Sequence, residues 1–289
     1  MNLLVRINLA LIVTFALTAT AVGIGCFSLL QSQARQEAVR EAALMMDSAL
    51  AIRTYTSDEI RPLLEVQMAN RFLPESVPSY SATQHFLRLR AAHPEYSYKE
   101  AALNPTDLRD RATDWETDLI QQFRNVASTH EIVGERDTPT GKSLFLARPI
   151  SATQDCLTCH SSAAAAPAAL VARYGANNGF GWLPHEIVGA QIVSVPLAST
   201  VAHANRVFKG VLLAVTAILL AALLLVNGFL YFLIVRPVRR IARIADEVSL
   251  GNMSAGEFPA RGSPELIGLA RSFNRMRTSL SKALKLLED

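Results

Sequence analysis

Cysteine is scarce in this chain, which has Cys26, Cys156 and Cys159 among its 289 residues. A structural zinc site needs four nitrogen or sulfur ligands, and Cys26 lies in a long apolar stretch remote from the other two. A zinc site built from two cysteine pairs is therefore excluded. A thioredoxin-like redox pair is disfavoured as well, because no βαβ pattern surrounds residues 156–159.

Charged residues are absent from two long stretches, 7–30 and 211–235. Each exceeds the roughly 20 residues that a helix needs to cross the hydrocarbon core of a bilayer. The sequence therefore predicts two transmembrane helices. For the first stretch a cleaved signal peptide is the alternative, since small residues at 19–25 resemble a cleavage site. Its apolar run exceeds the usual h-region of about 7–15 residues, however, which favours a retained helix.

Basic residues are distributed unevenly around the second stretch. Arg206 and Lys209 precede it, whereas four arginines crowd its exit: Arg236, Arg239, Arg240 and Arg243. By the positive-inside rule the C-terminal segment is cytoplasmic. Residues 31–207 then face the other side, the periplasm of a bacterial inner membrane. The four arginines indicate topology near anionic membrane lipid, and no patch is typical of nucleic-acid binding.

Helical periodicity is present at three places in the segment 31–207. An apolar stripe continues the first membrane helix outward at Val39, Ala43, Met46 and Leu50. A shorter helix is predicted over 79–92, with Phe86 and Leu89 facing inward. A third is predicted over 107–125, capped by Thr106 or Asp107, and its apolar face contains Leu108, Ala112, Trp115, Leu119 and Phe123.

Strand patterns occur later in the same segment, over 143–150 and 187–197. Between them, the glycine-rich residues 174–182 predict a loop with an aromatic tip. Helices that precede strands within a segment of this size predict an α+β, sensor-like domain.

The sequence CLTCH, residues 156–160, is the most specific motif in the chain. Two thiols three positions apart each add to one vinyl group of the same porphyrin, and the adjacent imidazole becomes an axial ligand of the iron. The motif therefore predicts one covalent haem c, attached through Cys156 and Cys159 on a short loop, with His160 as the proximal ligand. Such attachment occurs outside the cytoplasm, where the charge distribution independently places the motif. A disulfide between the two cysteines is the alternative.

The second axial ligand of the iron is left open by the sequence. Met68 and His85 lie in apolar stretches and are the candidates, in that order. A third alternative is an open coordination position that binds a small gas. Arg148 and Arg173 are candidate partners of the haem propionates only because they flank the motif, and ordinary surface arginines are the favoured interpretation.

The segment 236–289 carries two short coiled-coil seams. The first contains Val238, Ile241, Ala245 and Val248, and the second contains Leu266, Leu269, Phe273, Met276, Leu280, Leu284 and Leu287. Each seam is too short to be stable alone, and the connector between them contains Gly251, Gly256, Pro259 and Gly262. Two such helices from each of two chains would form a parallel four-helix bundle. An amphipathic helix that lies on the membrane is the alternative.

This segment resembles a HAMP domain. A proline follows the membrane span, Glu265 opens the second helix, and Phe273, Asn274 and Met276 form the typical run. The segment departs from the pattern at Pro264, where an acidic residue usually precedes Glu265. The resemblance implies a homodimer that converts a small displacement of a membrane helix into a change of bundle packing.

The outer segment resembles the extracytoplasmic haem-c sensor family, which has a PAS-like fold. The matching stretches are residues 72–82, 98–116, 146–150, 156–161, 165–167, 174–175, 179–182 and 188–196. The resemblance implies a haem-binding redox or gas sensor, whose distal ligand varies and in at least one member is a thiolate from the first outer helix. This chain has no cysteine there, and Met68 lies near the comparable place.

Together these features predict four segments along the chain. They are an N-terminal transmembrane helix at 1–30, an extracytoplasmic c-type haem sensor domain at 31–207, a second transmembrane helix at 208–235 and a cytoplasmic HAMP domain at 236–289.

The favoured function is a signal-transduction receptor that senses redox state or a diatomic gas through its haem. We expect its output from a separate cytoplasmic signalling protein, because no output domain follows the bundle in this sequence. A membrane-anchored monohaem cytochrome c that carries electrons is the alternative, although it has no use for a HAMP domain. An enzyme is not expected, since no catalytic acid–base pair is found. The sequence does not decide between redox poise, oxygen, nitric oxide and carbon monoxide as the stimulus.

Overall fold

The structure is a computed structural model that describes residues 3–288 except 69, 70, 127, 140, 253 and 259–262. Side chains are described for the same residues apart from 3, 199 and 284–288. The chain divides into two compact units. One unit is Ile24–Phe208, called the outer unit below, and the other combines Met1–Gly23 with Lys209–Asp289.

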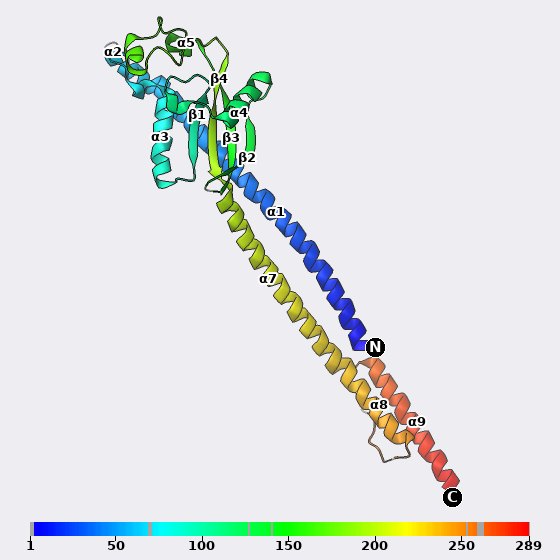
Figure 1. Cartoon of the computed structure of the whole chain (residues 1–289). Coiled ribbons are helices and arrows are strands. Elements are labelled where there is room, and N and C mark those ends of the chain that lie inside the picture. Colours follow the sequence, from blue (N-terminus) through cyan, green and yellow to red (C-terminus); the bar gives the residue numbers. More distant parts are fainter. Residues whose placement is uncertain are drawn as a thin grey trace. The chain divides into compact units, whose positions relative to one another are not determined.

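A four-stranded antiparallel sheet forms the centre of the outer unit (Figure 1). Its strands are β1 (Ser97–Ala102), β2 (Ile132–Thr138), β3 (Gly141–Ser151) and β4 (Ile187–Pro196), in the order β1-β4-β3-β2. The strands predicted at 143–150 and 187–197 are confirmed as β3 and β4. The sequence analysis missed β1 and β2, because their sequences, SYKEAA and IVGERDT, carry charged residues that strands usually lack. The expected α+β class is confirmed.

Helices cover both faces of this sheet. On one face α1 (Leu3–Tyr55) packs Met46 and two alanines against side chains of β3 and β4: Leu144, Leu146, Val193 and Val195. On the other face α4 (Asp114–Asn125) packs Ile120 and Phe123 against Ala101, Ala147, Ala190 and Ile192. Successive strand residues point to opposite faces, so β3 and β4 each serve two hydrophobic cores.

The buried face of α1 differs from the predicted stripe. Met46 is buried as expected, but Leu50 is exposed and Val39 and Ala43 are only partly buried. The buried positions are mostly alanines: Ala34, Ala38, Ala42 and Ala49. Small side chains let a helix approach a sheet closely, so the most apolar stripe of the sequence is not the one that is buried deepest.

Helix α4 begins later than predicted. Asp107 caps only a short 3-10 turn, Leu108–Asp110, by accepting a hydrogen bond from the Arg109 N–H at 3.1 Å. Leu108, assigned to the buried face, is exposed. The helix itself starts at Asp114, after Thr113. The helix predicted at 79–92 is confirmed as α3 (Pro78–Ala92), with Phe86 buried and Leu89 half-buried.

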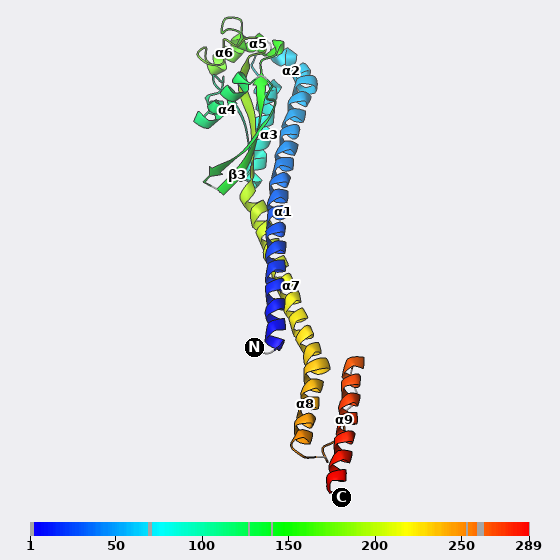
Figure 2. The same cartoon turned by 90° about the vertical axis from the view of Figure 1, so that its right-hand side faces the viewer.

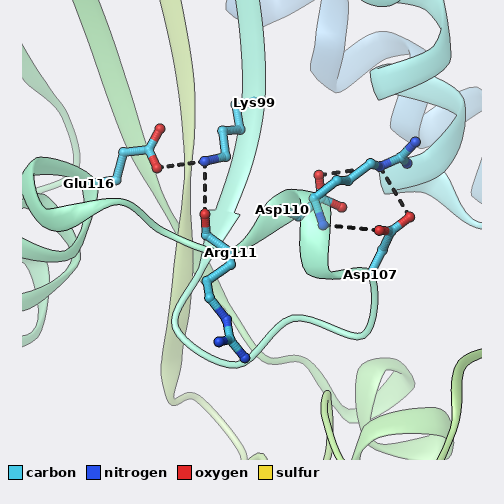
Figure 3. Close-up of polar contacts among 6 residues, drawn as sticks. Lys99, Asp107, Asp110, Arg111 and Glu116 are labelled. Atoms are coloured by element: carbon cyan, nitrogen blue, oxygen red, sulfur yellow. Dashed lines mark hydrogen bonds and ion pairs between the residues drawn. The ribbon is translucent and has the colours of Figure 1, made fainter.

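Glu116 connects the start of α4 to the sheet through hydrogen bonds and an ion pair (Figure 3). Its carboxylate accepts a hydrogen bond from the Thr113 N–H at 2.8 Å, which completes a capping box, and another from Lys99 Nζ of β1 at 2.7 Å. Lys99 also donates to the Arg111 carbonyl at 2.9 Å. The Glu116 side chain is only 7% exposed, so this ion pair is shielded from water.

The remaining elements of the outer unit lie between these. They are a π-helical turn Thr56–Ile60, α2 (Arg61–Met68), a 3-10 turn Pro74–Ser76, α5 (Gln154–His160) and α6 (Ala168–Tyr174). In both views, α2 and α5 lie at the end of the sheet opposite to the point where β4 runs into α7 (Leu197–Leu230) (Figures 1 and 2).

Two helical stretches are long and apolar enough to cross a membrane. They are Leu4–Met68 and Thr200–Ser249, whose most apolar windows have mean hydropathy 2.1 and 2.7 and are 0% buried. They contain the predicted spans 7–30 and 211–235. In the second unit, Asn8 and Asn227 exchange two amide hydrogen bonds of 2.9 and 2.7 Å. Such polar pairs hold apolar helices in a defined register.

The C-terminal helices are α8 (Arg236–Ser249) and α9 (Pro264–Glu288), preceded by a π-helical turn, Tyr231–Val235. Ile241, Ile244 and Val248 of α8 pack with Ala255, Phe258 and Ala270. Ile241 and Val248 belong to the predicted seam, whereas Ile244 replaces the exposed Val238. Pro259 and Gly262 of the predicted connector lie outside the described residues, as do the side chains of Leu284 and Leu287.

Replacement of Glu116 by alanine removes the capping hydrogen bond and the partner of Lys99. We expect the free energy of unfolding of the outer unit to fall by about 2–3 kcal/mol. The measurement is urea unfolding of the full chain in detergent, followed by the fluorescence of Trp115 and Trp182. The matched control is Glu37→Ala, whose pair with Arg40 is exposed on both sides, and whose loss should cost about 0.5 kcal/mol or less. Equal losses in the two variants would contradict this role of Glu116.

Candidate functional site

The residues of the CLTCH motif lie on α5 and not on the short loop that the sequence analysis expects. The local cause is a helix start at Thr153, whose carbonyl accepts the Cys156 N–H at 3.0 Å. Residues three and four positions apart share one face of a helix. Cys156, Cys159 and His160 therefore project from the same side of α5, and both cysteines are free thiols.

The imidazole of His160 is held in one orientation by its Nδ1 atom. This nitrogen lies 2.6 Å from the Gly179 carbonyl oxygen. A carbonyl only accepts hydrogen bonds, so Nδ1 carries the proton and Nε2 keeps its lone pair. The Thr106 hydroxyl lies 3.5 Å from the same nitrogen. A histidine that binds a metal through Nε2 typically donates its other N–H in this way.

Trp182 fixes the plane of the same ring. The two rings stack with centroids 4.0 Å apart and an interplanar angle of 9°. The backbone reinforces this contact, because the Trp182 N–H donates to the His160 carbonyl at 3.2 Å and the Gly181 N–H donates to Ser161 at 3.1 Å. The loop that follows α6 therefore folds back over the C-terminal end of α5.

Asn104 anchors this loop to the part of the chain that follows β1. Its side-chain oxygen accepts the Gly179 N–H at 3.1 Å, and its amide donates to the Phe180 carbonyl at 3.2 Å. Gly179 has φ +82°, and a Cβ there would lie 2.1 Å from the Thr106 hydroxyl oxygen. Position 179 thus requires glycine, because its φ is positive and because a Cβ there would collide with Thr106.

The titration properties of the site suit a neutral imidazole. Burial lowers the pKa of His160, and the hydrogen bond to the Gly179 carbonyl only partly opposes this effect. Burial also raises the pKa of the Cys159 thiol, although the Arg61 guanidinium opposes the rise.

The two candidate distal ligands lie in different environments. Met68 ends α2, whose half-buried positions Arg61, Leu64 and Met68 recur with helical spacing. Helix α2 lies at the same end of the sheet as α5 (Figures 1 and 2). His85 is exposed on α3, where its ring packs edge-on against Phe86 at 5.2 Å.

The two arginines considered as partners of the haem propionates lie in different surroundings. Arg148 donates to Asp47 and to Glu131 at 2.9 Å each, so both sides of its guanidinium are occupied by carboxylates of the protein. Arg173 lies on α6 above the ring of its neighbour Tyr174. Among the described residues, no group of three or more His, Cys, Asp or Glu side chains is arranged to hold a metal ion.

Sequence reasoning missed Asn104, Thr106, Gly179 and Trp182 as functional residues. The turn at 104–105 and the aromatic loop at 174–182 are both visible in the sequence. Nothing in the sequence, however, pairs two segments that lie about seventy-five residues apart, as Asn104 and Gly179 do. The donor set that results is two thiols and one oriented imidazole on a single helix face, and this set fits a covalently attached haem.

Comparison with known families matches residues 31–196 to the Tll0287-like family and residues 229–282 to the HAMP domain. The chain belongs to the Tll0287-like family. The expected order of a haem-sensor family domain with a PAS-like fold followed by HAMP is thereby confirmed. The chain is thus a membrane-anchored signalling sensor.

Comparisons with solved structures and with curated proteins give two further findings. The crystal structure of the cyanobacterial haem-protein Tll0287 aligns with 16% sequence identity over 55% of this chain and 95% of that chain, with a TM-score of 0.44. The search of curated proteins finds no match.

Gly179→Ala should destabilise the outer unit more than Gly175→Ala. Both residues have positive φ, +82° and +83°, but a Cβ at Gly175 meets nothing within 4 Å. We expect Gly175→Ala to cost about 1 kcal/mol from backbone strain. Gly179→Ala should cost about 1–3 kcal/mol more, because Thr106 must move. Urea unfolding followed by tryptophan fluorescence measures both, and equal costs would show that the contact with Thr106 is not tight.

Proposed function

We propose that this chain is a transmembrane receptor that senses redox state or a diatomic gas through one haem c. In this proposal Cys156 and Cys159 form the two thioether bonds, and Nε2 of His160 is the proximal ligand of the iron. The observation that carries the proposal is the single helix face that presents both thiols and an imidazole whose Nδ1 is bonded to Gly179. The match of residues 31–196 to the Tll0287-like family, which shares its name with a haem-protein, supports the assignment of a haem.

When bound, the haem supplies an iron that changes oxidation state or binds a gas at its second axial position. We assign Met68 to that position, because it lies on the half-buried face of α2 and α2 lies at the same end of the sheet as α5 (Figures 1 and 2). His85 is the alternative ligand. Met68 would hold the iron through its thioether sulfur, and without that ligand the position would be open to a gas.

A buried polar network joins α1 to the strand that continues into α7. Arg53 of α1 forms an ion pair with Glu100 of β1, whose side chain is 7% exposed. Glu100 also accepts the Tyr98 hydroxyl at 2.6 Å, and that hydroxyl accepts from Gln191 of β4 at 3.1 Å. Because β4 continues directly into α7, a shift of α1 against β1 has a packed, hydrogen-bonded route to the start of α7.

The HAMP segment supports a homodimer as the output device. In the described single chain, Leu269, Met276 and Leu280 of the predicted seam are exposed. A parallel four-helix bundle made with a second copy buries them. We propose that the repacked bundle acts on a cytoplasmic signalling protein, with the haem domain in the periplasm of a bacterial cell and the basic exit of α7 against anionic lipid.

Expression of the full chain with a haem-ligation system tests the attachment. We expect the peptide that contains residues 154–161 to gain the mass of one haem, and the pyridine haemochrome spectrum to report two thioethers. The double variant Cys156→Ala/Cys159→Ala should lose both signals, whereas Cys26→Ala should keep them. In the same expression system, the Met68→Ala variant should show altered ligand bands in its visible and resonance Raman spectra. The His85→Ala variant should show the wild-type bands. A wild-type chain without bound haem refutes the proposal.

Cross-linking distinguishes the sensor from an electron carrier. The substitution Met276→Cys in the Cys26→Ala chain places a reactive thiol on the bundle. A bifunctional maleimide, which needs no oxidant, links this thiol to its copy in the partner protomer. The rate of cross-linking therefore reports how the bundle packs. Reduction of the haem should change the rate of cross-linking between protomers about fivefold or more. The haem-free Cys156→Ala/Cys159→Ala version is the control and should not respond to the reductant. A holo chain whose rate is equally insensitive would favour an electron carrier.

A further inference from the structure

We propose that Arg71 and Arg173 form the binding site for the haem propionates, in a surface hollow between residues 71–72 and α6. This inference rests on the proposed function, since it assumes that a haem is attached to α5. It replaces the expectation for Arg148, whose guanidinium is already occupied by Asp47 and Glu131.

The hollow has a volume of about 420 Å³ and is lined by Arg71, Phe72, Ala169, Ala172 and Arg173. Its walls are held together by aromatic contacts. The ring of Phe72 packs edge-on against Tyr174 with centroids 5.8 Å apart, and Arg173 lies 5.6 Å from the centre of the same tyrosine ring. Phe72 is also buried, so the two segments that carry the arginines are fastened to each other.

The charge in this hollow is unbalanced. Six other arginines of the outer unit pair with carboxylates: Arg35, Arg40, Arg53, Arg109, Arg124 and Arg148. Within the part of the chain that the structure describes, Arg71 and Arg173 have no such pair. Two guanidinium groups that line one hollow repel each other unless an anion lies between them. Guanidinium groups bind carboxylates in a bidentate manner, so two carboxylates of one ligand match two arginines.

The hollow also lies where the far edge of an attached haem is expected. A porphyrin carries its vinyl groups on one side and its two propionates on the other. Helices α2 and α5 lie at the same end of the sheet (Figures 1 and 2), and Cys156 and Cys159 of α5 mark the vinyl edge. The eight residues of α2 extend about 12 Å, and Arg71 lies just beyond their end.

The test uses the full chain with haem attached and compares Arg71→Gln, Arg173→Gln and the double variant. The matched control is Arg88→Gln, an arginine that donates to the carbonyl of Gln84 on its own helix. We expect covalent haem to be retained in all of them. Loss of the cations should raise the pKa of the propionates, so the pH dependence of the midpoint potential should move upward by about one pH unit in the double variant. The Arg71→Lys/Arg173→Lys chain should stay close to wild type because it keeps both charges.

Three other results would overturn the inference. The first is a double variant that holds haem and titrates like Arg88→Gln. The second is a wild-type profile that acetate or phosphate shifts, which would indicate a free anion in the hollow. The third is a lysine variant that behaves like the glutamine variant, which would indicate a packing role only. If the wild type carries no haem at all, the proposed function itself fails, and that outcome is read directly from the haem content.

Discussion

The hydrogen bond from Nδ1 of His160 to the Gly179 carbonyl is the interaction on which the rest of this site depends. At 2.6 Å it is short, and it makes Nε2 the nitrogen that can bind iron. Without it, the motif on α5 would still present two thiols, but the imidazole would be free to rotate or to hold its proton on the wrong nitrogen. The stacking of Trp182 and the anchoring by Asn104 serve this one bond, because they place the loop that carries Gly179.

The same bond connects the site to the rest of the outer unit. The loop of Gly179 is tied to Asn104, which follows β1, and β1 pairs along its length with β4. The strand β4 lies at the centre of the sheet and continues into the second membrane helix. In the proposed receptor the cofactor would lie at one end of the sheet, and the helix that leads to the output begins at the other. The buried ion pair of Arg53 and Glu100 adds α1 to this connection, so both helices that lead toward the membrane contact the sheet beneath the site.

The sequence predicts the chemistry of the site better than its surroundings. The CLTCH motif is local, so its three side chains can be named from their spacing, and β3 and β4 are visible because their apolar residues outnumber polar ones. Strands β1 and β2 escape notice because Lys99, Glu100 and the charged residues of β2 serve ion pairs or solvent. The deeply buried face of α1 is made of alanines, whose hydrophobic signal is weak beside that of Val39 and Leu50. Asn104 and Gly179 meet only through the fold, and single-sequence patterns carry no such pairing.

Nitrogen-15 NMR of the histidines tests the central claim most directly. The full chain carries six histidines, and the signal of His160 is assigned by its loss in His160→Gln. In the haem-free Cys156→Ala/Cys159→Ala chain at neutral pH, the account predicts a neutral ring with the proton on Nδ1 and a bare Nε2. The Asn104→Ala variant should weaken this preference, since it releases the loop of Gly179. A His160 that carries its proton on Nε2, or that exchanges freely between the two tautomers, would contradict the account.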